Sequence, residues 1–160
     1  MSKYLVTYFS ATGTTAKVAE KLADSIGADI YEIRPAVPYV TEDLDWMDEN
    51  SRTSKEMHNK SYRPAIERGD LNVDSYDVVF VGFPIWWYVA PTIINTFLES
   101  YDFSDKKVIL FATSGGSQFG ETLDGLKSSV SPSANLLLGS VINGDYDYHA
   151  FASWVNILDL

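Results

Sequence analysis

The sequence predicts an α/β fold: a doubly wound, five-stranded parallel sheet in the order 2-1-3-4-5, with helices on both faces and a single domain over residues 1–160. Apolar runs alternate along the chain with segments of helical periodicity, which implies right-handed crossovers and a parallel sheet. Residues 77–83 are apolar almost without interruption, as in a strand buried on both faces. No repeat or linker interrupts the alternation, and 160 residues are enough to bury a substantial core.

The first strand leads directly into the first helix. Residues 3–9 form an apolar run, and residues 14–26 have the spacing of a helix that Gly27 ends. Residues 28–34 then alternate between apolar and polar side chains as far as Pro35. This period of two predicts a second strand that is less buried than the first.

Residues 36–75 have the least regular pattern in the chain. A helix is expected over about residues 44–58, where it would place Trp46 and Met57 among polar side chains. The segment is long for a connection between two strands, so part of it is expected to cover another part of the molecule. Its acidic cluster forms either a solvated face or a docking patch, and consists of Glu42, Asp43, Asp45, Asp48 and Glu49.

The rest of the chain repeats the alternation of strand and helix. Pro91 suits the first turn of a helix, and Asn143-Gly144 is a turn sequence. Trp154 is expected to face inward from the last helix. Strands are predicted at 77–83, 107–113 and 135–142, and helices at 92–101, 121–130 and 150–158.

Residues 10–15 carry a concentrated set of hydrogen-bond donors. A strand that runs straight into a helix leaves the first N–H groups of the helix unpaired, and Gly13 lets the backbone turn there. Such converging donors suit a phosphate, although an ordinary N-capped helix is the alternative. No lysine or arginine lies between Lys3 and Lys17, and no G-x-G-x-x-G opens the helix, so nucleotide-hydrolysing and dinucleotide loops are disfavoured. Four hydroxyl groups add donors: Ser10, Thr12, Thr14 and Thr15.

The pattern Ser10-x-Thr12-Gly13-x-Thr15, followed by Ala19 and Leu22, resembles the phosphate loop of flavodoxins. Thr7 and Ala11 depart from the flavodoxin pattern without removing a principal phosphate donor. The resemblance implies a flavodoxin-like fold over nearly the whole chain, with a loose fit at residues 36–75, and flavin mononucleotide (FMN) as the cofactor. By position it assigns the phosphate to Ser10, Thr12, Gly13, Thr14 and Thr15, and the flavin ring to segments 84–88 and 113–117.

Three loops that would meet at the carboxyl edge of this sheet match the parts of FMN, which are a phosphate, a polar linker and a flat ring. The loop after the third strand brings three aromatics, and at least one of them is expected to lie near solvent or a ligand. The alternative is that two of the aromatics lie in the core and the third caps the following helix. The loop after the fourth strand lacks bulk, so its backbone can approach a ring edge unless it is a plain flexible turn. The residues concerned are Pro84, Ile85, Trp86, Trp87 and Tyr88, and Thr113, Ser114, Gly115, Gly116 and Ser117.

The charge of the chain bears on its partners. Twenty-two acidic and twelve basic residues give a formal charge of −10, which disfavours nucleic acid and anionic membranes and favours redox proteins with basic faces. The chain has no cysteine, and His58 and His149 show no ligand spacing, so no metal is expected. With no signal peptide and no apolar run near the ~20 residues of a membrane span, a cytoplasmic location is expected.

Two functions fit these features. The first is a flavodoxin acting as a low-potential electron-transfer protein, which needs no catalytic acid or base, and no catalytic residue is expected. The alternative is an FMN-dependent oxidoreductase that uses NAD(P)H to reduce quinones or flavins, with residues 86–88 walling a substrate slot and residues 36–75 as its lid. The fold alone does not decide between them. A binding module without a cofactor is a third class, which the intact hydroxyl loop disfavours.

Overall fold

The structure, a computed structural model, describes residues 3–114, 118–143 and 147–158. Its centre is a five-stranded parallel sheet in the order β2-β1-β3-β4-β5, which confirms the predicted doubly wound sheet. Each strand lies close to its predicted bounds. The strands are β1 (Tyr4–Tyr8), β2 (Asp29–Glu32), β3 (Val78–Pro84), β4 (Lys107–Thr113) and β5 (Asn135–Val141).

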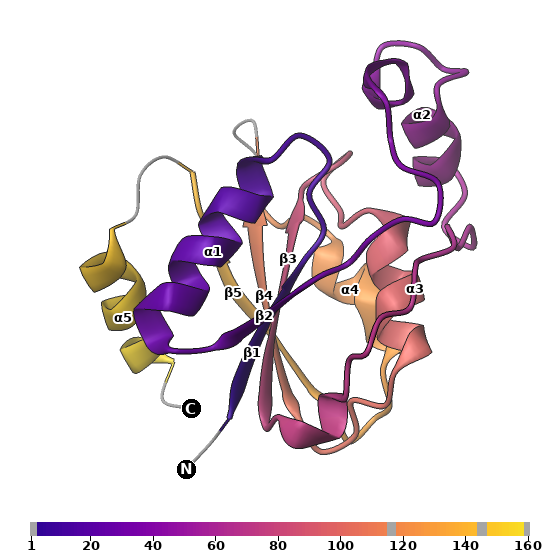
Figure 1. Cartoon of the computed structure of the whole chain (residues 1–160). Coiled ribbons are helices and arrows are strands. Elements are labelled where there is room, and N and C mark those ends of the chain that lie inside the picture. Colours follow the sequence, from indigo (N-terminus) through magenta and orange to yellow (C-terminus); the bar gives the residue numbers. More distant parts are fainter. Residues whose placement is uncertain (1–2, 115–117, 144–146, 159–160) are drawn as a thin grey trace.

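Helices cover both faces of the sheet (Figure 1). On one face, α1 (Thr14–Ile26) and α5 (Tyr148–Ile157) bury apolar side chains such as Leu22 and Phe151 against Phe80 of β3. On the other face, α3 (Thr92–Ser100) and α4 (Thr122–Leu126) pack over Val79 and Val81. Trp154 of α5 packs against the first core, with its ring centroid 5.9 Å from that of Phe80, as its predicted inward orientation requires.

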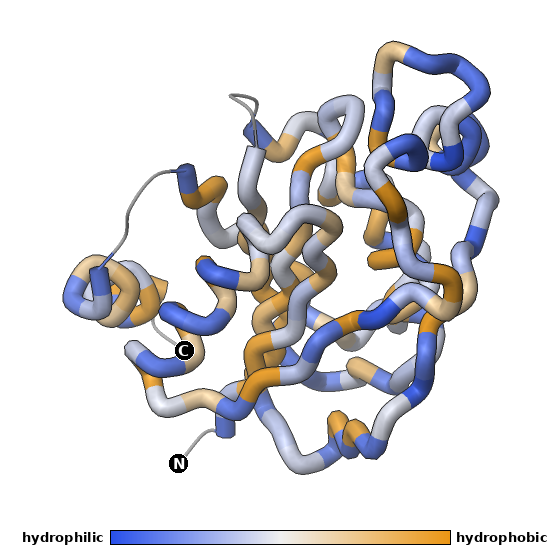
Figure 2. Tube along the Cα trace, turned by 45° about the horizontal axis from the view of Figure 1, so that its top comes forward, coloured by the Kyte–Doolittle hydropathy of each residue, from blue (hydrophilic) through white to orange (hydrophobic). Residues whose placement is uncertain are grey.

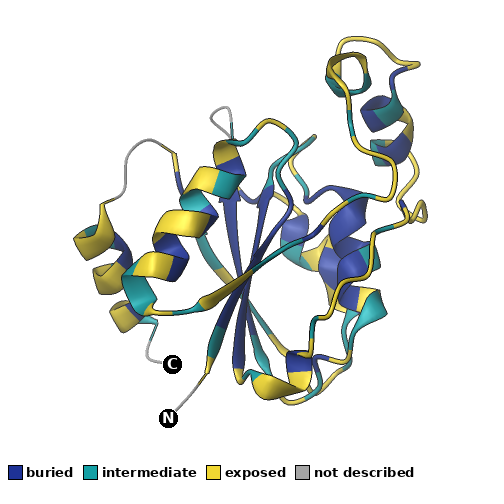
Figure 3. Cartoon of the chain, viewed as in Figure 1, coloured by how far each residue is buried: buried dark blue, intermediate teal, exposed yellow. Residues whose placement is uncertain are grey.

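The central strands are buried and the edge strand is not (Figure 3). β3 and β4 bury six of their seven residues each, whereas β2 has none in the buried class, so the prediction that it is less buried than β1 is confirmed. Figure 2 shows hydrophobic residues concentrated along the central strands. Across the described part of the chain, no helix combines the length and apolar character that a membrane span requires.

The prediction of a helix over residues 44–58 is wrong for the first half of that range. A 3₁₀ turn, η1 (Thr41–Leu44), comes first, and α2 begins only at Arg52 and ends at Met57. Aspartate side chains explain the gap, because Asp45 accepts a hydrogen bond from the Met47 N–H (3.1 Å) and Asp48 accepts one from the Asn50 N–H (2.9 Å). These local bonds give the backbone an alternative to helical pairing.

Two other helices differ from their predicted bounds. In place of the helix expected over 121–130, the structure has α4 followed by a 3₁₀ turn, η3 (Lys127–Ser129). Elsewhere in the chain, another 3₁₀ turn, η2 (Val73–Ser75), precedes β3. The helix expected from residue 150 begins at Tyr148 because the carboxylate of Asp147 caps it, accepting a hydrogen bond from the Ala150 N–H at 2.8 Å.

Residues 36–63, which we call the arm, extend away from the sheet at the end where α1 begins (Figure 1). Arg52 connects several parts of the arm to one another. The Arg52 guanidinium lies over the ring of Tyr39 (3.7 Å), donates to Glu56 (3.0 Å) and donates to the Val37 carbonyl (2.7 Å). Tyr39 in turn donates to Glu56 at 2.5 Å. The arm therefore has its own buried polar centre.

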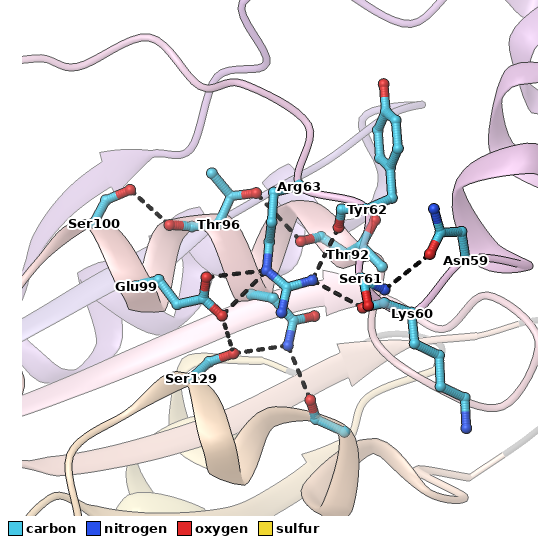
Figure 4. Close-up of polar contacts among 12 residues, drawn as sticks. Asn59, Lys60, Ser61, Tyr62, Arg63, Thr92, Thr96, Glu99, Ser100 and Ser129 are labelled. Carbon is cyan, nitrogen blue, oxygen red and sulfur yellow. Dashed lines mark hydrogen bonds and ion pairs between the residues drawn. The ribbon is translucent and has the colours of Figure 1, made fainter.

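A second polar network fastens the end of the arm to α3 (Figure 4). Arg63 donates from Nε to both oxygens of Glu99, at 3.0 and 3.1 Å. Ser129 of η3 also donates to Glu99 (2.7 Å) and accepts from Asn95 (2.9 Å). The Arg63 guanidinium holds the pKa of Glu99 below its ordinary value, and the Ser129 hydrogen bond acts in the same direction.

Candidate functional site

The carboxyl edge of the sheet brings the predicted loops together. Backbone hydrogen bonds continue the sheet past its strands, from Phe9 to the Gly82 carbonyl (2.9 Å), from Ile85 to the Thr113 carbonyl (2.8 Å) and from Ile142 to the Ala112 carbonyl (2.7 Å). The segments that follow β1, β3, β4 and β5 therefore start side by side. Figure 1 shows this edge next to the first turn of α1.

The loop before α1 presents neutral hydrogen-bond donors. Gly13 has φ 94°, a conformation that glycine adopts without strain, and its N–H donates to the hydroxyl of Ser10 at 3.0 Å. The first helical bond runs from Lys17 N–H to the Gly13 carbonyl (3.2 Å), so the N–H groups of residues 14–16 precede the helical ladder. The hydroxyl-bearing residues Thr12 and Thr14 are exposed beside them. This arrangement suits a small dianion such as a phosphate.

A buried pair of hydroxyls links this loop to β4. Thr15 and Thr113 are only 1% and 5% exposed, and their Oγ1 atoms are hydrogen-bonded at 2.8 Å. Sequence reasoning assigned Thr113 to the flavin ring, and the structure shows its hydroxyl bonded to Thr15 in the first turn of α1. Because either hydroxyl can donate, donation by Thr113 leaves the Thr15 proton available to an anion.

The loop after β3 is a two-residue hairpin made of aromatic residues. Trp86 and Val89 exchange backbone hydrogen bonds at 3.0 and 3.1 Å, and the two residues between them both have positive φ, 50° at Trp87 and 65° at Tyr88. Asparagine and glycine normally occupy such turns. For bulky side chains this conformation costs on the order of 1 kcal/mol each, so backbone strain is concentrated here.

Residues 120 and 121 brace this aromatic hairpin. The Tyr88 carbonyl accepts a hydrogen bond from the Glu121 N–H at 3.1 Å. Gly120 has φ 56°, and a Cβ there would lie 2.3 Å from that same carbonyl oxygen. Glycine at position 120 is therefore required both by its conformation and by the close approach of the hairpin.

The three aromatics of the hairpin have different surroundings. Trp86 makes edge-to-face contacts with the rings of Phe9 and Tyr39, with both centroids 5.7 Å away. Trp87 is 36% exposed and contacts the ring of His58 in the arm at 6.0 Å, and Tyr88 is 68% exposed. The expectation that at least one of the three lies near solvent is confirmed.

A cavity of about 440 Å³ lies between the aromatic hairpin and the arm. The arm contributes Leu44, Trp46 and Thr53, and residues 85–88 form the other wall. Sequence reasoning did not identify the arm residues of this cavity. The one signal in the sequence was Trp46, a large aromatic among polar residues, which the structure leaves 69% exposed.

The loop after β4 is tied to the end of β5. Ser114 N–H donates to Asn143 Oδ1 at 2.9 Å, and Asn143 Nδ2 donates to the Ser114 hydroxyl at 3.3 Å. Sequence reasoning had assigned Asn143 to a turn and not to the site. The predicted ring contacts Gly115, Gly116 and Ser117, and Gly144 of the predicted turn, lie outside the described residues.

The family of the chain follows from its sequence taken as a whole. The flavodoxin family profile matches residues 3–158. The chain belongs to the flavodoxin family. A search of curated proteins gave no significant match.

Solved structures agree with this assignment. The chain is 46% identical to a candidate flavoprotein of Bacteroides eggerthii, with a TM-score of 0.92 over 100% of this chain and 99% of that chain. A candidate flavoprotein of Bacteroides uniformis is 44% identical, with a TM-score of 0.89 over 97% and 98% of the two chains. A Lactobacillus acidophilus flavoprotein in complex with FMN shares the fold, at 22% identity and a TM-score of 0.71 over 97% and 99%.

Two titratable groups of the arm, Tyr39 and Glu56, are hydrogen-bonded to each other. Burial, and next the hydrogen bond to Glu56, raise the pKa of Tyr39 above its ordinary value, so the phenol stays protonated. Glu56 is only 3% exposed and its charge is matched by Arg52. Among the described residues, no group of three or more His, Cys, Asp or Glu side chains is placed to hold a metal ion.

Proposed function

We propose that this member of the flavodoxin family binds FMN at the carboxyl edge of its sheet and transfers electrons at low potential. The observation that carries the proposal is the neutral donor loop before α1. Its leading N–H groups and its hydroxyls converge without any charged side chain between Lys3 and Lys17. In this proposal Ser10, Thr12, Gly13, Thr14 and Thr15 hold the phosphate.

The ring would lie between the aromatic hairpin and the loop after β4. Bound FMN supplies one- and two-electron redox chemistry, and the protein supplies binding, orientation and electrostatics. Trp87 and Tyr88 offer exposed aromatic surface at that place, held by the strained hairpin. The formal charge of −10 disfavours anionic reduced flavin and so lowers its potential, and it favours redox partners with basic faces.

A titration of the purified protein tests the cofactor. One equivalent of FMN is expected to stay bound after desalting, and flavin adenine dinucleotide is not, because the part of the chain that the structure describes offers one loop of neutral donors and no second pyrophosphate-binding element. Removing the Thr12 and Thr15 hydroxyls together should weaken FMN binding by at least about tenfold, since one hydrogen bond to a charged group contributes about 1.5–3 kcal/mol. Unchanged affinity in this double variant would mean that the phosphate binds elsewhere.

A second candidate function is an FMN-dependent oxidoreductase that takes electrons from NAD(P)H. The cavity between arm and hairpin favours it, because an electron carrier that works only through protein docking needs no cavity for a small acceptor. A steady-state assay with NADH or NADPH and a quinone separates the two functions. Saturable turnover would support the oxidoreductase, and its absence would leave the electron carrier.

A further inference from the structure

A second cavity, of about 390 Å³, lies on the side of the molecule that α3 and α4 cover, and we call it the side cavity. Its lining comes from the end of the arm (residues 57–63), from the first turn of α3 and from α4. Among the described residues that line it, none belongs to the phosphate loop, to residues 84–88 or to residues 113 and 114. The side cavity is therefore distinct from the site proposed for FMN, and its volume is in the range of small-molecule pockets.

The wall formed by the arm and by α3 is positive. The charge of Arg63 is matched, because its Nε donates to both oxygens of Glu99 at 3.0 and 3.1 Å. Lys60 makes no ion pair with any described residue, and its side chain extends away from the network of Arg63 and Glu99 (Figure 4). Thr92, the first residue of α3, also lines the cavity, so the positive end of the helix dipole acts on the same wall. This wall favours a carboxylate.

The wall formed by α4 and the residue before it is negative. Glu121 and Asp124 both line the cavity. Among the described residues, Glu121 makes no ion pair, and the ion pair of Asp124 is a long one with Lys127 (3.7 Å). Neither carboxylate is paired with Lys60. One cation and two carboxylates therefore line the same space without neutralising one another, and a molecule that carries both charges would complement them.

Apolar side chains and one unsatisfied hydroxyl complete the lining. Met57, Val89 and Leu126 offer aliphatic surface. Thr92 is only 7% exposed, and its Oγ1 is buried with no hydrogen-bond partner in the part of the chain that the structure describes. Such a group is rare in folded proteins and calls for a partner that the protein itself does not supply. The lining thus combines apolar surface with polar groups that remain to be satisfied.

We propose that the side cavity binds a small zwitterion with an aliphatic side chain, of the class of the free aliphatic amino acids. The carboxylate of the ligand lies toward Lys60 and the start of α3, and its ammonium group lies toward Glu121 and Asp124. The aliphatic part packs against the apolar lining. The proposal does not depend on FMN binding, because the side cavity and the proposed flavin site share no described residue.

The test uses the full chain, uniformly ¹⁵N-labelled and titrated at constant ionic strength with L-leucine. Two further probes each lack one charge: 4-methylpentanoate is leucine without its ammonium group, and 3-methylbutylamine is leucine without its carboxylate. The backbone N–H signals of Thr92 and Gly125 are expected to shift saturably with leucine, whereas that of Ile30, in the edge strand β2, should not. Each single-charge probe should bind about two- to fivefold more weakly, because it loses one exposed ion pair. Equal affinity for the three probes, or no saturable shift, would overturn the proposal.

Two charge-removing variants test the orientation of the ligand. Lys60→Met should weaken binding of leucine and 4-methylpentanoate about two- to fivefold and should not weaken binding of 3-methylbutylamine. Glu121→Gln should weaken binding of leucine and 3-methylbutylamine and should not weaken binding of 4-methylpentanoate. Lys21→Met, which removes an exposed lysine of α1 on the other face of the sheet, is the matched control and should leave all three affinities unchanged. The reverse pattern, or the same loss for all three probes in one variant, would contradict the proposal.

Repeating the leucine titration with and without FMN separates this proposal from the proposed function. If the two sites are distinct, leucine binds both forms of the protein with the same affinity. If FMN displaces leucine, the side cavity is part of the flavin site and the proposal is wrong. If FMN fails to bind at all, the proposed function fails, and the titration of the free protein still decides the side cavity.

Discussion

The buried hydroxyl pair of Thr15 and Thr113 offers a double-mutant cycle in which stability and cofactor binding respond differently. Thr15→Val leaves the Thr113 hydroxyl buried without its partner at 2.8 Å, and Thr113→Val does the same to Thr15. An unpaired buried hydroxyl costs about 1–3 kcal/mol, so each single variant should lose that much free energy of unfolding. The double variant replaces both hydroxyls by methyl groups and should recover most of the loss.

Affinity for FMN should follow Thr15 alone. If Thr113 donates to Thr15 and Thr15 donates to the phosphate, Thr15→Val removes a hydrogen bond to a charged group. A loss of about 1.5–3 kcal/mol corresponds to about 10- to 150-fold weaker binding. Thr113→Val should stay within about threefold of wild type, and the double variant should resemble Thr15→Val.

Urea unfolding of the protein without FMN measures the first pattern, because bound cofactor would add to the apparent stability. Flavin fluorescence titration measures the second. The reasoning is refuted if Thr113→Val weakens FMN binding as much as Thr15→Val does. It is equally refuted if the double variant is no more stable than either single variant.

Three further predictions concern the hairpin and the arm. Bound FMN should be nearly non-fluorescent and should quench tryptophan emission, because aromatic contacts bring ring centroids to about 4.5–7 Å. If the emission spectra of the free and FMN-bound protein coincide, the hairpin is not the ring site. Gly120→Ala should destabilise the protein by about 2 kcal/mol and weaken FMN binding, since its Cβ would meet the Tyr88 carbonyl at 2.3 Å, and wild-type behaviour in both assays would show that the brace is dispensable. Glu99→Gln should lose about 1 kcal/mol of unfolding free energy at neutral pH, a modest figure because the side chain is 40% exposed. The lowered pKa of Glu99 means that its contribution is present at neutral pH and is lost as pH falls through that lowered pKa, so the difference from wild type should shrink and vanish in acid. A difference in urea unfolding that stays constant as pH falls would argue against the ion pair.

Local sequence signals were sufficient for the sheet. Residues 77–83 and 107–113 are apolar because both faces of β3 and β4 are covered, and the alternation at residues 28–34 reflects an edge strand with an exposed side. Gly13 was identified as a turn residue before a helix, and it has the positive φ that such a turn requires. In each case the residue and its immediate neighbours determine the structure.

The arm depended on contacts that sequence pattern does not encode. Residues 41–51 of the arm are shaped by aspartate side chains that accept hydrogen bonds from nearby backbone N–H groups, and the polar centre of the arm joins Tyr39 to Glu56 across 17 residues. The alternative function anticipated a slot between residues 86–88 and the segment 36–75, but no sequence signal showed that Trp46 would lie opposite residues 85–88. Likewise, no local signal indicates that Thr113 bonds Thr15 from 98 residues away.

The central claim is that the loop before α1 binds the phosphate of FMN, and comparing FMN with riboflavin tests it most directly. Riboflavin has the same ring without the phosphate, so the wild-type protein should bind FMN far more tightly. Thr12 is exposed in this loop, and Thr12→Val should weaken FMN binding by about 10- to 150-fold, whereas Thr12→Ser, which keeps the hydroxyl, should not. Neither substitution should change the affinity for riboflavin. Equal affinities for FMN and riboflavin in the wild type, or an equal loss for both ligands in Thr12→Val, would contradict the assignment of the phosphate to this loop.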